Sequence, residues 1–328
     1  FAEAWDVDHV SAISDPTSET EDLGAPVIWY EDQPPAIDER RALLAASIVG
    51  PVFEAGALAA VDEGARDALA ALLERGLVRR PAGVAVAGRD GEAFEFRHQL
   101  LQQAAYDLVL RETRRRGHAA VARWIAAQAP PRPELSAPHR ERAGEIAGAI
   151  DDWHAAAVAA RARWANADAA RDLRRALALV PDDAPRRRFE LLLLLEDTCL
   201  RLVDRAAVGS CVEALRALAG NLDDAARLAA GVRHAIYLFD GGDAAASLAS
   251  AEALLAQADP AAWQERVRLH SLAQAAHARQ GHYGDAGRHA EAGLALARAH
   301  GDRLNEAKIL NQLGMDALEQ GQHLPAES

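Results

Sequence analysis

Apolar residues recur along most of this chain at the spacing of helices, and at one place at the spacing of a strand. Phe94-Glu95-Phe96 alternates as a strand does. The apolar residues after it recur at helical spacing: Leu100, Ala104 and Leu108, with Leu101 and Ala105 beside them. A second helix follows the linker Arg111-Glu112-Thr113, which can supply its N-cap. The apolar stripe of that second helix consists of Val121, Ala122 and Ile125. The pattern predicts one strand that leads directly into two amphipathic helices.

The residues before this strand predict three helices and a β-hairpin. The first helix starts near Ala36 and breaks at Gly50-Pro51, and a short second helix runs through Phe53 to Val61. The third extends from about Glu63 to Arg75, where Gly76 stops it. Two short extended segments form the hairpin: residues 77–80 and 93–96. Three helices and a hairpin predict a winged-helix-like unit.

After the proline-rich linker at residues 130–133, the chain predicts helical pairs as far as its end. Glycines that mark turns align at spacings of 39 and 40 residues: Gly242, Gly281 and Gly321. A period of about 40 residues is typical of helical hairpins stacked into a solenoid. An earlier unit from Trp153 to Pro181 fits the same pattern. We therefore predict an all-α fold: a winged-helix-like unit with a small β-hairpin, followed by an α-α superhelix of tetratricopeptide-like repeats.

This pattern divides the chain into three parts. They are an irregular acidic lead over residues 1–35, the winged-helix-like unit with its following helical pair over residues 36–130, and the repeat array over residues 134–328. The chain begins at Phe1 without a methionine and stops at Ser328 just past a predicted helix. We expect it to be part of a longer protein.

The junction Phe96-Arg97-His98-Gln99-Leu100-Leu101, followed by Ala105-Tyr106 and Leu108, resembles a segment of bacterial signal-transducing ATPases of the STAND class. In that family the segment lies just after the ATPase module and before a tetratricopeptide-like helical array. The stretch from Arg40 to Val61 and the later ALLERGLVRR also resemble the family's winged-helix region. The resemblance covers most of residues 36–328 in order. Members are often joined to a nucleotide-cyclase or a transcription-regulator domain.

The resemblance implies a regulatory arm that is not itself an enzyme. Such an arm senses a ligand or protein and sets the state of a nucleotide-binding module outside this chain. No cofactor is expected within the chain, and ATP or ADP is expected in the upstream module. The implied partners are the adjoining ATPase module and a protein or peptide on the concave face of the repeats, along the first helix of each pair.

The same resemblance implies that Arg97 and His98 contact the nucleotide. Related switches place a histidine at this junction against the phosphates of bound diphosphate. They follow it with an acidic residue, where this chain has Gln99. A purely structural histidine that satisfies the strand-to-helix junction is the alternative for His98.

Composition and missing motifs exclude several classes of enzyme. No GxxxxGK[ST] phosphate loop is present, and Lys308 is the only lysine among the 328 residues, so the chain does not hold ATP in the P-loop manner. The sequence also lacks GxSxG, HExxH and a glycine-rich turn between a strand and a helix. The hydrolase, metalloprotease and dinucleotide-binding classes therefore lack their essential residues.

Charge and cysteine content indicate which classes of partner and which cellular compartment suit the chain. The formal net charge of -13 disfavours nucleic-acid binding, and the predicted third helix offers only Arg66 and Arg75 against three acidic residues. No apolar run approaches the roughly 20 residues of a membrane helix. Two cysteines, Cys199 and Cys211, are too few for a disulfide framework, which favours the cytoplasm.

Twelve histidines raise the question of a metal site. His277, His282 and His289 fall near repeat turns, but they lack the three- or four-residue spacing that puts two ligands on one face of a helix. On this ground we predict no metal ligands. Two other functions stay open beside the regulatory arm: a stand-alone tetratricopeptide-type scaffold that recruits a protein, and a DNA-binding winged-helix regulator.

Overall fold

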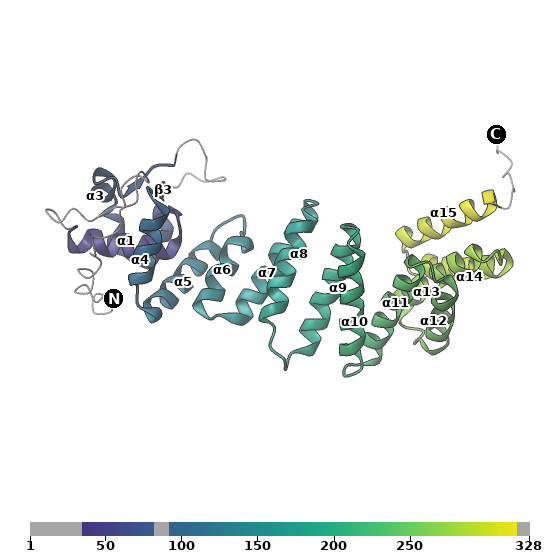
Figure 1. The fold of residues 1–328 in the computed structure, drawn as a ribbon. Coiled ribbons are helices and arrows are strands. Elements are labelled where there is room, and N and C mark those ends of the chain that lie inside the picture. Colours follow the sequence, from purple (N-terminus) through teal and green to yellow (C-terminus); the bar gives the residue numbers. More distant parts are fainter. Residues whose placement is uncertain (1–34, 82–91, 320–328) are drawn as a thin grey trace, which may run out of the picture. The chain divides into compact units, whose positions relative to one another are not determined.

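The structure, a computed structural model, describes residues 35–81 and 92–319 (Figure 1). Its contacts group into two compact units that meet in sequence between Ala160 and Arg161. The glycine-containing turn of the hairpin, Gly321 and all of the acidic lead except residue 35 lie outside the described residues. Among the helices that are described, none is long and apolar enough to span a membrane.

The first unit begins with short helices around a small sheet. Its elements are α1 (Ile37–Val49), β1 (Val52–Glu54), α2 (Ala55–Val61), the 3-10 helix η3 (Glu63–Arg66), α3 (Leu69–Glu74), β2 (Val78–Arg79) and β3 (Ala93–Phe96). The strands are antiparallel in the order β1-β3-β2. The predicted hairpin of β2 and β3 is therefore present, and β1 pairs with the other edge of β3. Phe53 and Phe94 stack in the core with ring centroids 5.8 Å apart.

Two predictions for this region are wrong. Phe53 belongs to strand β1 and not to the second helix, because its backbone pairs with Phe94 across the sheet. The expected third helix is broken into η3 and α3. The break lies at residues 67–68, between the end of η3 and the start of α3. Asp62 caps the start of η3: its carboxylate accepts the Gly64 amide and binds Arg41 at 2.8 Å.

Four helices complete the first unit and lead into the second: α4 (Gln99–Leu108), α5 (Arg111–Ala126), α6 (Pro133–Ala143) and α7 (Ile146–Ala162). The buried side of α4 carries Leu101 and Ala105, whereas Leu100 is 78% exposed. The expected cap residues are part of helix α5 itself, which starts at Arg111 without a side-chain cap, and Thr113 is buried. The predicted stripe Val121, Ala122 and Ile125 is buried as expected.

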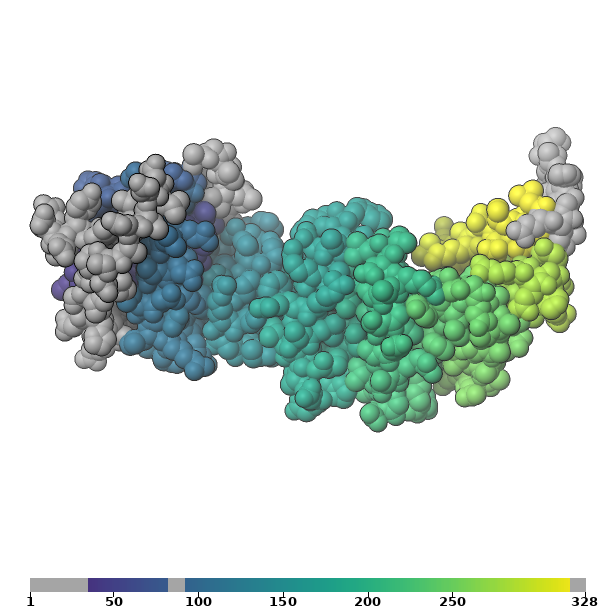
Figure 2. All heavy atoms as spheres, viewed as in Figure 1, coloured from purple at the N-terminus to yellow at the C-terminus, as the bar shows by residue number. Residues whose placement is uncertain are grey.

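The second unit consists of helices that each pack against the next (Figure 2). They are α8 (Asn166–Leu179), α9 (Pro185–Arg201), α10 (Arg205–Ala219), α11 (Asp224–Asp240), α12 (Ala244–Gln257), α13 (Trp263–Arg279), α14 (Tyr283–Ala299) and α15 (Arg303–Glu319). Helix α13 also contacts α11 and α15, so first helices of successive pairs adjoin. The all-α fold with tetratricopeptide-like repeats is confirmed.

Turns between the paired helices repeat with a fixed register. A residue in the left-handed conformation occurs every 39 residues: Trp164, Val203, Gly242 and Gly281. In the last three turns the next amide bonds back to a carbonyl five residues earlier, as in a Schellman motif: Asp204 to Cys199, Asp243 to Leu238 and His282 to His277. We call these four left-handed residues the turn residues.

Small and medium-sized side chains, all apolar except that of Ser247, let the paired helices approach closely. The fifth position after each turn residue is buried in all four hairpins: Ala169, Val208, Ser247 and Ala286. The ninth position is buried as well: Leu173, Val212, Ala251 and Ala290. The repeat therefore extends to residue-level packing, which the two glycine turns alone did not reveal.

Candidate functional site

Arg97 and His98 lie together where β3 ends and α4 begins. Both side chains are exposed. His98 is the N-cap residue of α4 and has extended backbone, but its side chain makes no cap hydrogen bond. The Arg97 guanidinium lies against Gly76, where an added Cβ would meet Nη1 at 2.8 Å. At this junction the His98 backbone carbonyl accepts the Leu101 amide, but no side-chain cap hydrogen bond supports a structural role for the imidazole.

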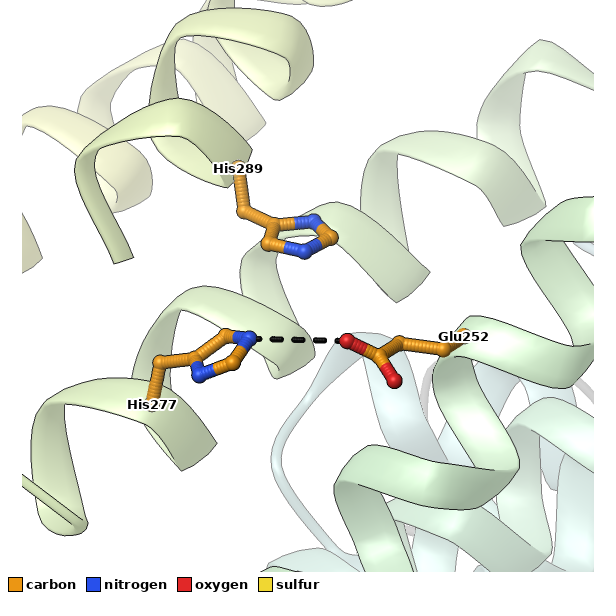
Figure 3. Close-up of side chains that lie close together, drawn as sticks. All are labelled: Glu252, His277 and His289. Carbon is orange, nitrogen blue, oxygen red and sulfur yellow. Dashed lines mark ion pairs between the residues drawn. The ribbon is translucent and has the colours of Figure 1, made fainter. Parts of the chain in front are cut away.

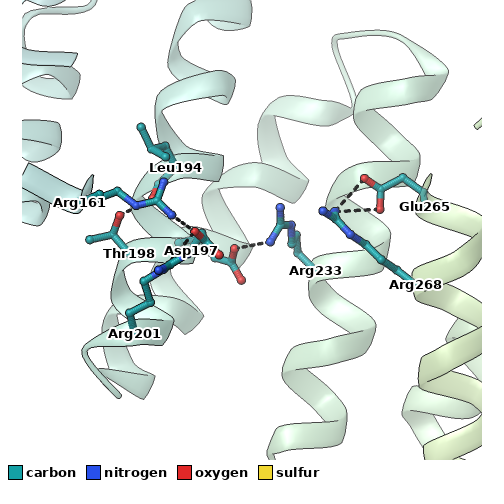
Figure 4. A network of polar contacts seen from close by, with 9 residues as sticks. Arg161, Leu194, Asp197, Thr198, Arg201, Arg233, Glu265 and Arg268 are labelled. Carbon is teal, nitrogen blue, oxygen red and sulfur yellow. Dashed lines mark hydrogen bonds and ion pairs between the residues drawn. The ribbon is translucent and has the colours of Figure 1, made fainter. Parts of the chain in front are cut away.

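The second candidate site is a row of charged residues on the first helices of the repeats (Figure 4). We call it the first-helix row, and it consists of Arg161, Glu196, Asp197, Arg201, Arg233, Glu265 and Arg268. Asp197 binds Arg161 and lies 3.6 Å from Arg201. Arg233 of α11 reaches Glu196 of α9 at 2.9 Å. Ion pairs of the row thus link α7 to α9 and α9 to α11, whereas Glu265 and Arg268 pair within α13.

The pair between Glu196 and Arg233 is the most buried part of this row. Glu196 is 1% exposed, and burial raises the pKa of its carboxyl although Arg233 acts against that change. Removing one partner of such a pair leaves a buried charge without compensation, which typically costs about 3–5 kcal/mol. A similar polar link joins α13 to α15, where the Gln274 amide donates to Asp316 at 3.2 Å.

A third group of polar residues lies between α12, α13 and α14 (Figure 3). Glu252, His277 and His289 each offer a ligand atom, and these atoms lie within 4.8 Å of one another. His277 Nε2 is 3.5 Å from the Glu252 carboxylate. His277, His282 and Asp285 form an overlapping group with the same spread. These residues converge from neighbouring helices, so they do not show the three- or four-residue spacing of two ligands on one helix.

A buried polar chain joins α4, α5 and α6 in the first unit. The Tyr106 hydroxyl lies 2.9 Å from His118 Nε2, and His118 Nδ1 lies 2.9 Å from His139 Nδ1. Burial, His139 and two arginines lower the pKa of His118 to about 3. Burial and then Arg142 lower the pKa of His139 to about 4. Both imidazoles are therefore neutral at pH 7, so one of the two Nδ1 atoms donates to the other.

No protein-family model and no curated protein matches the chain. Among solved structures it is similar to a signal transduction ATPase with numerous domains (STAND) with a tetratricopeptide repeat sensor, from Pyrococcus horikoshii. The identity is 13% and the TM-score 0.42, over 87% of this chain and 48% of that one. The chain thus spans about half the length of that protein.

Proposed function

We propose that this chain is the sensor and protein-interaction arm of a signal-transducing ATPase. In this proposal the repeats bind a protein segment along their first helices, and the arm transmits binding to a nucleotide-binding module and an output domain outside the chain. The observation that carries the proposal is the repeating hairpin whose first helices share the first-helix row. Stacked hairpins leave an extended concave face, and such faces bind extended protein segments.

The exposed members of the row suit a charged partner segment. Arg201 and Arg268 each pair with an acidic residue on their own helix, at 3.6 Å and 3.1 Å. Pairs of this exposed kind contribute little to stability, about 0–1 kcal/mol, so a partner carboxylate can replace the intramolecular acid at low cost. The partner class that fits is therefore an extended segment that carries acidic residues.

The first unit supports the link to a nucleotide-binding module. Its elements follow the order α1, β1, then α2, η3 and α3, then β2 and β3, and the strand order is β1-β3-β2; this order supports a winged-helix unit. The unit has few groups for reading DNA, since Arg75 at the end of α3 pairs with Glu39 at 3.0 Å. We infer that the winged helix packs beside the nucleotide-binding module.

The test uses charge reversal of Arg201 and Arg268 together. Their matched controls are Arg171 and Arg288, exposed arginines of second helices that also pair with an acid on their own helix. Extended peptides selected from a displayed library against the chain should lose affinity by at least tenfold for R201E/R268E and keep it for R171E/R288E. Equal loss in both variants, or selection only of peptides that bind elsewhere, would argue against a first-helix binding surface.

Coupling to nucleotide is measured in the longer protein that carries the module. There R201E/R268E should abolish the change in ATP turnover that a selected peptide causes, while the chain alone turns over no ATP. If peptides bind through the first helices and ATP turnover never responds, the repeats are a scaffold that recruits a partner. Salt-dependent binding of duplex DNA by the chain would instead favour the DNA-binding regulator.

A further inference from the structure

The histidine-rich group between α12, α13 and α14 has the chemistry of a transition-metal site. Two imidazoles and one carboxylate converge there: His277, His289 and Glu252. Ligand atoms around a tetrahedral metal, with bonds of about 2.0–2.2 Å, are separated by about 3.4 Å. His277 Nε2 and the Glu252 carboxylate are already 3.5 Å apart. Figure 3 shows a ring nitrogen of His289 directed toward this pair.

The neighbours of the group orient it. His289 Nδ1 lies 3.1 Å from Nδ1 of His270, an imidazole of α13. In the tautomer in which His270 Nδ1 accepts the His289 Nδ1–H, His289 Nε2 keeps its lone pair for a metal. Metal-binding histidines commonly use their second nitrogen in this way.

His277 and Glu252 complement each other. His277 is 8% exposed, which fixes its ring, and its Nδ1 has no hydrogen-bond partner in the described structure. The Glu252 side chain is 53% exposed and is free to rotate toward a metal. The group therefore joins a fixed buried ligand to an adjustable one. Its ligand atoms lie within 4.8 Å of one another and need to approach to about 3.4 Å for a tetrahedral arrangement.

The repeat register provides an internal comparison. His277 and His289 occupy the positions four before and eight after the turn residue Gly281, and Glu252 lies ten after Gly242. One set of equivalent positions in the repeats is held by Arg174, Cys199 and Cys211, and another by Glu213, Leu238 and Ser250. In the first set Arg174 Nη2 lies 4.0 Å from Cys199 Sγ and the two thiols interact, so the three positions meet there too. Of these three sets, the histidine set alone combines imidazole donors with an acid.

We propose that Glu252, His277 and His289 bind a divalent transition-metal ion of the zinc type and so link consecutive repeat hairpins. Two imidazole nitrogens and a carboxylate oxygen suit Zn²⁺, and three protein ligands leave one position for water or a partner group. The ion connects α12 to α13 and α14. Its binding stabilises the folded second unit by mass action.

The experiment adds Zn²⁺ to the metal-free chain and measures affinity by calorimetry and Tm by thermal unfolding. We expect one Zn²⁺ per chain, a rise in Tm, and an absorption spectrum of tetrahedral Co²⁺ when cobalt replaces zinc. E252Q and H289Q should each weaken binding by more than tenfold. H270Q should weaken it by about 10–100-fold through the outer contact. The control H282Q should leave the affinity unchanged.

E252Q is the most informative variant. Glu252 is half exposed, so its replacement should not disturb packing, whereas replacement of the buried His277 can. An E252Q variant with the wild-type Tm in the absence of metal and unchanged Zn²⁺ affinity would overturn the proposal. The proposal would also be overturned if H282Q or D285N lost Zn²⁺ binding while E252Q kept it. The overlapping group of His277, His282 and Asp285 would then be the site.

Discussion

Val203 has a backbone conformation that its side chain disfavours. It is the turn residue of the hairpin formed by α9 and α10, with φ 57°. A left-handed conformation costs an L-residue about 1–2 kcal/mol, and a β-branched side chain is a clear outlier there. The valine side chain is 88% exposed, so little packing offsets this cost. At the equivalent positions Gly242 and Gly281 carry no such cost.

We predict that Val203→Asn stabilises the chain by about 1 kcal/mol, because asparagine tolerates the left-handed region. Chemical denaturation, with an unchanged dependence on denaturant, measures the change. The reverse change at an equivalent position, Gly242→Ala, should lower the free energy of unfolding by a similar amount.

Leu200→Asn serves as the control, since it places the same new residue three positions earlier in helical backbone. It should destabilise the chain, because asparagine is a poorer helix former than leucine. If Val203→Asn and Leu200→Asn change stability in the same direction, backbone strain at Val203 is not the cause.

At the scale of elements, the sequence correctly predicted those helices, strands and turns that depend on the spacing of nearby residues. The long helices of the repeats, the hairpin of β2 with β3, and the turns at Gly242 and Gly281 follow from periodicity and glycine placement. Strand β1 did not, because its three residues are extended only through pairing with β3, far along the chain. The left-handed turns at Trp164 and Val203 were not predicted, because neither residue type is typical of that conformation.

The same distinction holds for the candidate sites. The junction of Arg97 and His98 is a local motif and was visible in the sequence. The group of Glu252, His277 and His289 comes from three helices, so a search for ligands one helical turn apart passed over it. The spacing of 12 residues between His277 and His289, equal to that between Cys199 and Cys211, is the signal that a repeat-aligned search would have used.

The buried polar chain of Tyr106, His118 and His139 makes the packing of α4, α5 and α6 dependent on pH. The folded-state pKa values of the two histidines are about 3 and about 4, below the ordinary 6.5. Below pH 6.5 the unfolded chain therefore binds protons that the folded chain excludes, and stability falls as the pH falls toward 4. Above 6.5 this contribution is fully present.

We predict that a shift from pH 7 to pH 5 destabilises this helical group by roughly 2–4 kcal/mol. Hydrogen exchange of the α5 and α6 amides, corrected for the intrinsic pH dependence, measures the local free energy of opening. His139→Leu should reduce the pH dependence by about half, whatever its effect at pH 7. His98→Leu, an exposed histidine of the same unit, should leave the dependence intact. A slope unaffected by His139→Leu would assign the acid sensitivity to other groups.

At the scale of the whole molecule, the formal net charge of -13 disfavours broad binding of nucleic acid, although 35 arginines and one lysine can still make local contacts with anions. Within the described first unit, Arg97 and His98 are adjacent exposed cationic or titratable residues at the start of a helix, where free backbone amides also favour an anion. We propose this junction as the place where a nucleotide of a neighbouring module is contacted.

We predict that His98→Ala in the longer protein raises basal activity and weakens diphosphate binding. A protonated imidazole beside phosphate oxygens forms a charge-assisted hydrogen bond worth about 1.5–3 kcal/mol, and loss of that bond biases a two-state switch by roughly tenfold to a hundredfold. Because His98 is exposed and makes no cap hydrogen bond, the substitution should leave the fold unchanged. Diphosphate affinity, basal turnover and Tm are measured together, with the exposed Arg111→Ala of α5 as the control. Unchanged affinity and turnover in a folded His98→Ala variant would exclude the phosphate contact, and a drop in Tm would assign His98 a structural role.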